Sequence, residues 1–444
     1  MLSFLNIMRT MLAKFVSFIY SALCVASTGV SAPSEMPKTP EDFTPALRFM
    51  VCSDIHINGE EGQKEPLRFV DAVNTAYAYA QEQSYSALDA VCVAGDFTDE
   101  GTREQYEIFN ECVAQAVKEP TKLVVCAGNH EYIEWRENHE GGSAVAVPVF
   151  EEMLSRKTDN HIVINGYHFI SVSPDDNGER FYTKKKWLRN ELDKAVADTG
   201  DKPVFVFQHP APTATIYGSI HWGDISVSQV LSKYPQVIDF SGHSHYPIND
   251  PRSIWQGTFT ALGSGTLSYF ETELDYIAGN HPYDCENAAQ FYIVEADKDG
   301  NVRVLCYDLI THQFFDREYY LTNLADRNYE YTYNKMKNRD SVPVFADDVK
   351  IGVSVNESGE TVLEFEGAKS NFVVESYKVS VAKNCILKVA DDNFSGKYMY
   401  LYMDDVYQVN LGKLESGKSY TAQIVALNAY SQTSKPLTYT FTAP

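Results

Sequence analysis

The chain has 444 residues, of which 44% are hydrophobic, so it is long enough to bury a full core and to divide into two or three domains. It holds 37 basic and 60 acidic residues, which gives a formal charge of −23 at pH 7. Nucleic-acid backbones and anionic membranes bind through clustered Lys and Arg, so this charge argues against both and favours a small ligand or a basic partner.

The first 32 residues differ from the rest of the chain. Arg9 and Lys14 precede the apolar segment 15–26, and small residues follow that segment. This is the pattern of a secretory signal peptide, so we expect a secreted protein, with the periplasm or the cell surface as alternatives. An uncleaved anchor is the other interpretation of the segment, although it is short for a membrane span, and no later stretch is apolar enough to cross a bilayer.

Short apolar runs alternate with helical patterns between residues 47 and 320. Five of these runs are typical of buried strands: 47–54, 88–96, 121–128, 202–209 and 236–243. A helix is predicted over 102–118, where Thr102 and Gln105 have the spacing of a capping box, and a hairpin is predicted over 161–173 around an Asn-Gly turn. Strands with helices between them predict an α/β sandwich.

The helical patterns end after about residue 340. Short runs that alternate apolar and polar residues then predict a small β-sandwich. This part resembles a fibronectin type III domain, on the segment LESGKSY at 414–420, which has the Leu, Gly and Tyr spacing of a tyrosine corner. The resemblance implies a spacer or adhesion module able to contact proteins or glycans. We therefore predict a signal peptide at 1–32, an α/β domain at 33–340 and a β-sandwich at 341–444.

Polar residues that can bind metals follow each of the five apolar runs. They are Asp54, His56, Asp96, Asp99, Asn129, His130, His209, His243 and His245. Strand ends in an open α/β sheet converge on one crevice, so we expect these side chains to meet although they are far apart in the chain. Five other histidines lack such neighbours and are predicted to be structural or surface residues: His139, His161, His168, His281 and His312.

The ordered motifs DIH, GDFTD, GNHE, a single His and GHSH resemble the calcineurin-like metallophosphoesterase family over most of residues 47–270. The resemblance implies a four-layer α/β/β/α sandwich and a binuclear metal centre. One implied metal is bound by Asp54, His56 and His245. The other is bound by Asn129, His209 and His243, and Asp96 bridges the two.

The resemblance also implies that His130 is the catalytic histidine. Asp99 stands where some members of the family have a carboxylate that orients and charges this histidine. The alternative for Asp99 is a capping role at the start of the 102–118 helix.

The residue types agree with this implied chemistry. Imidazole, carboxylate and amide ligands suit Fe, Mn, Zn or similar ions, and the absence of thiolates argues against a structural zinc. Two divalent ions, two carboxylates and a bridging hydroxide leave about one positive charge, which attracts a phosphate ester. We expect in-line attack by the bridging hydroxide, with His130 assisting.

The residues around the bridging Asp96 distinguish branches of the family. GDFTDEG lacks the iron-ligating Tyr of purple acid phosphatases, and Glu100 replaces the Arg of protein Ser/Thr phosphatases. The segment looks closer to the cyclic-nucleotide phosphodiesterase branch, although that branch often has GNHD instead of GNHE. With no evident Arg clamp, a monoanionic diester is the expected substrate.

Two alternatives stay open. A phosphomonoesterase would need an extra cation, which Arg136 could supply, and a catalytically inactive binding scaffold would lack ligands that this chain retains. Substrate contacts are expected from loops 131–143 and 211–224, through Trp135, Arg136, Tyr217, His221 and Trp222.

Overall fold

The computed structural model describes residues 35–444 except 138–141, 176–177, 179, 275–276, 282–284, 384–385 and 395–405. The predicted signal peptide and His139 lie outside the described residues. In the described ranges no helix combines the length and apolar character that a bilayer crossing requires. The chain forms two compact units, of which the second consists of Asn249–Pro251 and Asn334–Pro444. The predicted domain boundary after residue 340 stays a prediction.

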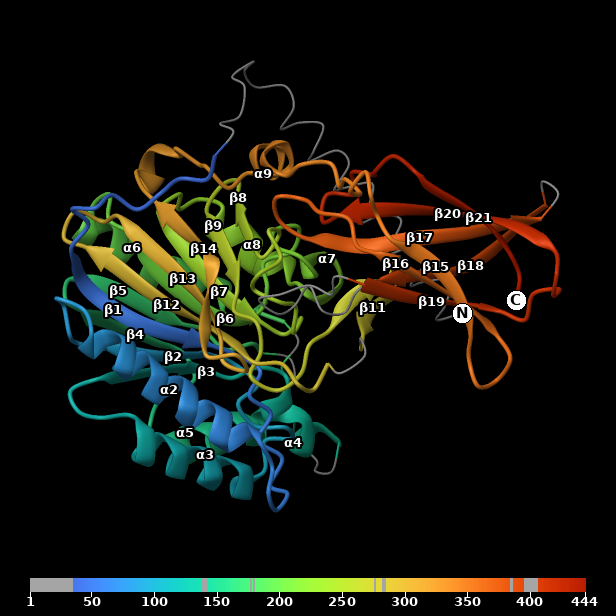
Figure 1. Cartoon of the computed structure of the whole chain (residues 1–444). Helices are drawn as coiled ribbons and strands as arrows, with labels where there is room; N and C mark the ends of the chain where they lie inside the picture. The colour runs from blue at the N-terminus through green and yellow to red at the C-terminus, as the bar shows by residue number, and fades with distance from the viewer. Residues whose placement is uncertain are drawn as a thin grey trace. The chain divides into compact units, whose positions relative to one another are not determined.

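Two six-stranded sheets form the centre of the first unit, with strand orders β14-β13-β12-β1-β2-β3 and β4-β5-β6-β7-β9-β8 (Figure 1). The first sheet consists of β1 (Pro45–Cys52), β2 (Ala90–Ala94), β3 (Lys122–Cys126), β12 (Gln290–Asp297), β13 (Val302–Asp308) and β14 (Gln313–Leu321). The second sheet consists of β4 (Asn160–Ile164), β5 (Tyr167–Ser171), β6 (Val204–Pro210), β7 (Val237–Gly242), β8 (Ile254–Gln256) and β9 (Thr260–Gly263). The strands β1, β2 and β3 are parallel to one another, as are β6 and β7, so their carboxyl ends emerge at a common edge of each sheet.

The two sheets pack face to face through aromatic side chains. The buried ring of Phe49 on β1 lies 5.0 Å from that of Phe169, 4.8 Å from that of Phe205 and 6.1 Å from that of Phe240, measured between ring centroids. These partners belong to β5, β6 and β7 of the other sheet. Since the apolar area removed from water drives this packing, it holds the carboxyl ends of both sets of strands near one another.

Helices cover the outer faces of both sheets. The helices α2 (Glu65–Gln81), α3 (Arg103–Ala116) and α5 (Ser143–Leu154) pack in one hydrophobic cluster with β1, β2 and β3 (Figure 1). The helices α6 (Lys185–Thr199) and α8 (Ile225–Leu231) pack in another with β5, β6 and β7. The predicted four-layer α/β/β/α sandwich is therefore confirmed.

The local predictions for this unit are also confirmed. Thr102 caps α3, because its hydroxyl accepts a hydrogen bond from the backbone N–H of Gln105 at 3.3 Å. The strands β4 and β5 pair antiparallel around Asn165 and Gly166, whose φ angles of 50° and 79° are those of a tight hairpin turn. The remaining elements of the first unit are η1 (His130–Tyr132), α4 (Ile133–Glu137), α7 (Ser219–Trp222), β10 (Thr272–Leu274), β11 (Ile277–Asn280) and η2 (Leu324–Asp326).

The second unit is a β-sandwich preceded by α9 (Tyr333–Arg339). Its sheets have the orders β15-β16-β19 and β18-β17-β20-β21. The strands are β15 (Ile351–Val355), β16 (Thr361–Glu366), β17 (Val374–Lys383), β18 (Ile386–Phe394), β19 (Val406–Gly412), β20 (Ser419–Asn428) and β21 (Leu437–Thr442). The hydroxyl of Tyr420 accepts a hydrogen bond from the N–H of Glu415 at 3.1 Å, which is the tyrosine-corner contact that the sequence predicts. The predicted fibronectin-like sandwich is confirmed.

Candidate metal centre

The predicted ligands lie in the loops that leave β1, β2, β3 and β7, and at the end of β6. Three clusters result, each with one carboxylate and two imidazoles whose ligand atoms lie within 4.8 Å of one another; one of them, His56 with Asp99 and His130, includes the predicted catalytic residues, and the other two are donor sets made of predicted ligands alone. The first set is Asp54, His56 and His245, and the second is Asp96, His209 and His243. The structure thus brings together side chains separated by as much as 191 positions, the span from residue 54 to residue 245.

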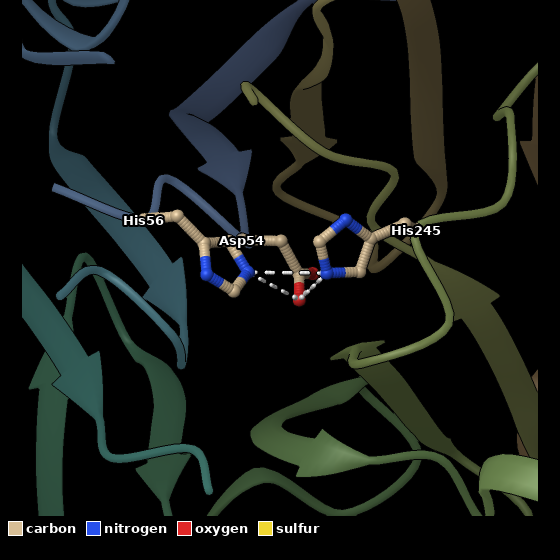
Figure 2. Close-up of side chains that lie close together, drawn as sticks. All are labelled: Asp54, His56 and His245. Carbon is tan, nitrogen blue, oxygen red and sulfur yellow. Dashed lines mark hydrogen bonds and ion pairs between the residues drawn. The ribbon is translucent and has the colours of Figure 1, made fainter. Parts of the chain in front are cut away.

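Asp54 lies between His56 and His245 in the first donor set (Figure 2). Its Oδ1 is 3.1 Å from His245 Nε2 and 3.9 Å from His56 Nε2, and the two Nε2 atoms are themselves 3.1 Å apart. The three atoms converge on one point, and all three side chains are buried.

The hydrogen bonds behind the two rings decide which nitrogen carries the proton. His56 Nδ1 donates to Asp99 Oδ1 at 3.0 Å, and His245 Nδ1 donates to the backbone oxygen of Tyr269 at 3.0 Å. In the neutral rings each Nε2 then carries a lone pair, and the two lone pairs meet 3.1 Å apart beside Asp54, where one proton or one metal ion can bind between them. A carboxylate or carbonyl behind the imidazole is the usual support of a metal-binding histidine, so the first set fits a metal ion.

The second donor set has the same construction. His209 Nδ1 donates to the backbone oxygen of Ala94 at 2.8 Å, which turns Nε2 towards Asp96 Oδ2 at 2.7 Å. Asn129 Oδ1 is buried and has no hydrogen-bond partner in the part of the chain that the structure describes. A buried amide oxygen normally has a partner, so this orphaned atom fits the metal-ligand role predicted for Asn129.

The two donor sets adjoin each other. Asp54 Oδ1 lies 3.8 Å from His209 Nε2, and the backbone oxygen of Asp96 accepts a hydrogen bond from the N–H of His56 at 3.0 Å. Asp96 is therefore in contact with both sets, and its bridging role stays a prediction. Ligation by the seven residues stays a prediction.

The charges of the two donor sets compensate each other. Burial would raise the pKa of Asp54, but His245 and His209 hold that pKa well below its ordinary value. Burial opposes protonation of His56 as well, yet hydrogen bonds to Asp54 and Asp99 raise its pKa to about 10. Burial and then the neighbouring His209 lower the pKa of His243 to about 3. Without a cation, the acidic groups favour protonated imidazoles. A metal ion that binds here would replace those protons on the imidazole nitrogens.

Five of the seven predicted ligands have left-handed backbone conformations. The φ angles are 51° at Asp54, 56° at His56, 48° at Asp96, 72° at His243 and 54° at His245. Residues other than Gly rarely adopt such angles, and they persist where the surrounding structure holds them. This strain coincides with the donor sets, which marks them as a functional site.

Glycines next to the ligands permit the close approach of the loops. A Cβ at Gly128 would collide with Asp96 Oδ1, and a Cβ at Gly242 would collide with Ser53 Oγ and Asp54 Oδ2. The glycines of GNHE and GHSH are therefore needed because no side chain fits between these loops.

His130 lies at the edge of the second donor set. Its Nε2 is 4.0 Å from Asp96 Oδ2, and its Nδ1 donates to the backbone oxygen of Asp99 at 2.6 Å. The side chain is 25% exposed, so a substrate can reach it. Burial would lower the pKa of His130, but Asp96 and Asp99 raise it, which favours the protonated form.

Asp99 supports two histidines at once. Its carboxylate hydrogen-bonds His56, its backbone oxygen accepts from His130, and its Oδ1 is 3.6 Å from His130 Nδ1. Because Thr102 caps α3, the helix-capping alternative for Asp99 is wrong.

Two aromatic residues lie beside the donor sets. Tyr269 was not predicted from the sequence, whereas Trp222 was predicted as a substrate contact. The ring of Tyr269 lies 4.2 Å from that of His245 and 5.7 Å from that of His56. The ring of Trp222 lies 5.4 Å from that of His243, nearly perpendicular to it. Tyr269 follows no strand-end motif, so nothing local in the sequence points to it.

The other predicted substrate contacts have protein partners of their own, and their part in substrate binding stays a prediction. Trp135 Nε1 donates to the backbone oxygen of Gly101 at 2.9 Å, and its ring packs against the hydrophobic core. Tyr217 is buried, and its hydroxyl accepts from the N–H of Glu273 at 3.0 Å. His221 Nε2 lies 3.8 Å from a Glu273 carboxylate oxygen, and Arg136 is half-buried on α4. Trp222 is the one of these five that contacts a predicted ligand by a described interaction.

The described histidines outside the donor sets pair with carboxylates. His161 and His168 hydrogen-bond each other at 2.7 Å, and Glu191 and Asp198 flank the pair. His312 Nε2 lies 3.6 Å from Asp71 Oδ2. His281 is closer to the site than the sequence predicts, because its ring lies 5.2 Å from that of Tyr269.

Two facing sheets with carboxylate and imidazole donors at their strand ends define the class of metal-dependent phosphoester hydrolases. Residues 47–247 match the family model of the calcineurin-like phosphoesterases. The predicted family is therefore confirmed.

Among curated proteins, the chain is 27% identical over 171 residues to the probable glycerophosphodiester phosphodiesterase GpdQ of Arcobacter nitrofigilis. The match spans 35% of this chain and 56% of that relative. Among solved structures, the purple acid phosphatase PPD1 of yellow lupin aligns with a TM-score of 0.43 and 13% identity, over 68% of this chain and 57% of its own. A fibronectin type III domain of the human KIAA0970 protein aligns with a TM-score of 0.15 and 16% identity, over 23% of this chain and 71% of its own.

Proposed function

We propose that this protein is a binuclear-metal phosphodiesterase. The observation that carries the proposal is the 3.1 Å separation of the Nε2 atoms of His56 and His245, both oriented by acceptors behind their rings and both beside Asp54. A metal ion can take the place of the proton between these two nitrogens, and the second donor set beside it again combines one carboxylate, Asp96, with two imidazoles.

The proposed centre holds one ion on Asp54, His56 and His245 and a second on Asn129, His209 and His243, with Asp96 between them. Bound divalent ions of the Fe, Mn or Zn type would activate water and offset the negative charge of the phosphoryl oxygens. The chain's own groups position these events. Asp54 and Asp96 supply negative charge, and the backbone and carboxylate acceptors keep the imidazoles in the ligating tautomer.

His130 has the role of an acid beside the centre. Its Nδ1–H is held by the backbone oxygen of Asp99, so its Nε2 is directed towards the region of Asp96. Burial lowers the pKa of His130, but Asp96 and Asp99 raise it and favour a proton on this ring, which could be donated to a phosphoryl oxygen or to the departing alkoxide. We expect His130 to act on the transition state without holding a metal.

A diester is the substrate class that the surroundings favour. In the described part of the chain, the hydrogen-bond and ion-pair partners of the seven predicted ligands are carboxylates, imidazoles and backbone or hydroxyl groups. The positive charge offered to a phosphoryl group then comes from the ions, which suits one negative charge better than two. The similarity to a probable glycerophosphodiester phosphodiesterase supports the same substrate class.

We also propose that residues 1–32 direct export of the protein. The charged start, the apolar segment and the small residues after it support this proposal. The C-terminal β-sandwich would then act as a spacer or as a contact for proteins or glycans.

The test combines metal analysis with two chromogenic esters on the same purified sample. We expect about two metal ions per chain and a higher kcat/KM for bis(p-nitrophenyl) phosphate than for p-nitrophenyl phosphate. Absence of hydrolysis after loading with Mn²⁺, Fe²⁺ or Zn²⁺ would contradict the hydrolase assignment. A preference for the monoester that disappears in Arg136→Ala would identify a phosphomonoesterase instead.

A further inference from the structure

The buried carboxylate of Glu131, the last residue of GNHE, binds backbone and hydroxyl groups of the loops that carry the second donor set. It is 1% exposed and accepts four hydrogen bonds. The donors are the N–H of Asp96 at 3.1 Å, the N–H of Thr98 at 2.9 Å, the hydroxyl of Thr98 at 2.8 Å and the N–H of Gly128 at 2.6 Å.

These donors come from two separate loops. Asp96 and Thr98 follow β2, whereas Gly128 follows β3 and immediately precedes Asn129. A further hydrogen bond links the same two loops, because the N–H of His130 donates to Asp96 Oδ1 at 2.9 Å. The loop with the predicted bridging carboxylate and the loop with Asn129 and His130 are therefore joined through Glu131.

The backbone of the joined loops is strained and closely packed, so this arrangement needs support from other groups. Asp96 has a φ of 48°, which costs free energy for a residue with a side chain, and Gly128 has no room for a Cβ beside Asp96 Oδ1. A buried carboxyl group that accepts three backbone N–H bonds can offset such a cost, because it satisfies three donors that folding removes from water.

We propose that Glu131 is a positioning residue, whose carboxylate sets the distance between the bridging Asp96 and the Asn129–His130 pair and so prepares the second metal site. This inference rests on the proposed function. It also explains why Glu and its length suit this position, since the side chain must span from one loop to the N–H groups of the other.

The first experiment measures the loops themselves, in metal-free protein, by hydrogen exchange. In Glu131→Gln one acceptor oxygen becomes an NH₂ group that faces N–H donors, so we expect faster exchange of the amides of Asp96, Thr98 and Gly128. Glu357→Gln is the matched control, because Glu357 is exposed and lies between β15 and β16 of the second unit, far in sequence from both loops. Wild-type protection of the three amides in Glu131→Gln would overturn the proposal.

The second experiment measures binding of Mn²⁺ by calorimetry and the exchange-coupled signal of the metal pair by electron paramagnetic resonance. We expect Glu131→Gln to bind the second equivalent of Mn²⁺ roughly 10- to 100-fold more weakly and to lose the coupled signal, as for other residues behind metal ligands. A wild-type second affinity and a wild-type signal would contradict the proposal.

Thr98→Val keeps the inference testable if Glu131→Gln does not fold, because it removes a single hydroxyl donor from the same carboxylate. We expect smaller changes of the same sign in exchange and in Mn²⁺ affinity, and identity with the wild type in both would overturn the proposal. Wild-type protein that binds no Mn²⁺ pair would refute the proposed function instead, so the two failures are distinguishable.

Discussion

The carboxylate of Asp99 hydrogen-bonds the predicted metal ligand His56, at 3.0 Å, more closely than it approaches the predicted catalytic residue His130, at 3.6 Å. The sequence motif points to His130 as its partner. Asp99 therefore fixes the tautomer of a ligand, and it supports the catalytic histidine chiefly through its backbone oxygen.

This geometry predicts the effect of Asp99→Asn. An amide holds the N–H of His56 less firmly than a carboxylate, so we expect the first metal to bind about tenfold more weakly and kcat at metal saturation to fall less. Titration with Mn²⁺, followed by assays at saturating metal, separates the two effects. A large loss of kcat with unchanged affinity would show that Asp99 acts on His130 after all; Asp201→Asn, at an exposed position, is the control.

Asp96→Asn tests the predicted bridge. A neutral side chain between two cations compensates their charge less well, so we expect turnover to be abolished and the metal content to fall below that of the wild type. Metal analysis by mass spectrometry checks this outcome. Full occupancy by two ions in the variant would refute the bridging assignment.

His130→Ala should lower turnover without lowering the metal content. The imidazole holds no predicted metal, so we expect wild-type metal content and a kcat reduced by about 10²–10⁴, the usual contribution of an acid or base catalyst. The measurement compares kcat and metal content on one preparation. Unchanged activity would exclude the catalytic role.

The stability of the folded protein depends on pH through Asp239 on β7, which is not a predicted metal ligand. It is fully buried, and burial raises the pKa of Asp239 to about 8, although Gln208 Nε2 donates to both carboxylate oxygens at 3.2 Å and opposes this rise. The folded protein therefore keeps a proton that the unfolded chain releases near the ordinary Asp pKa of 3.8. The stability that this group contributes falls as the pH rises between these two values.

Asp239→Asn removes this dependence, because an amide does not titrate in this range, while its Oδ1 can still accept from Gln208 Nε2. We expect the Tm of the variant minus that of the wild type to increase from pH 5 to pH 8. Thermal unfolding at the two values measures the difference, and a constant or shrinking difference would contradict the assignment.

The amino-acid sequence determined the parts of this protein that depend on neighbouring residues. Apolar runs that are too short for helices specify β1, β2 and β6, Thr102 specifies the start of α3, and Asn165 with Gly166 specifies a hairpin turn. The ordered motifs at the strand ends also identified the family, because each motif is local and their order along the chain is specific.

Tertiary structure decided the contacts between distant segments. The approach of His56 to His245 depends on two sheets that pack through Phe49 and its partners, and periodicity in one strand carries no information about that packing. For the same reason the sequence could not place Tyr269 beside His245, nor separate Trp222, which lies against a predicted ligand, from Trp135, which supports a loop. Loop path and sheet packing set these distances, and both arise only when the whole domain has folded.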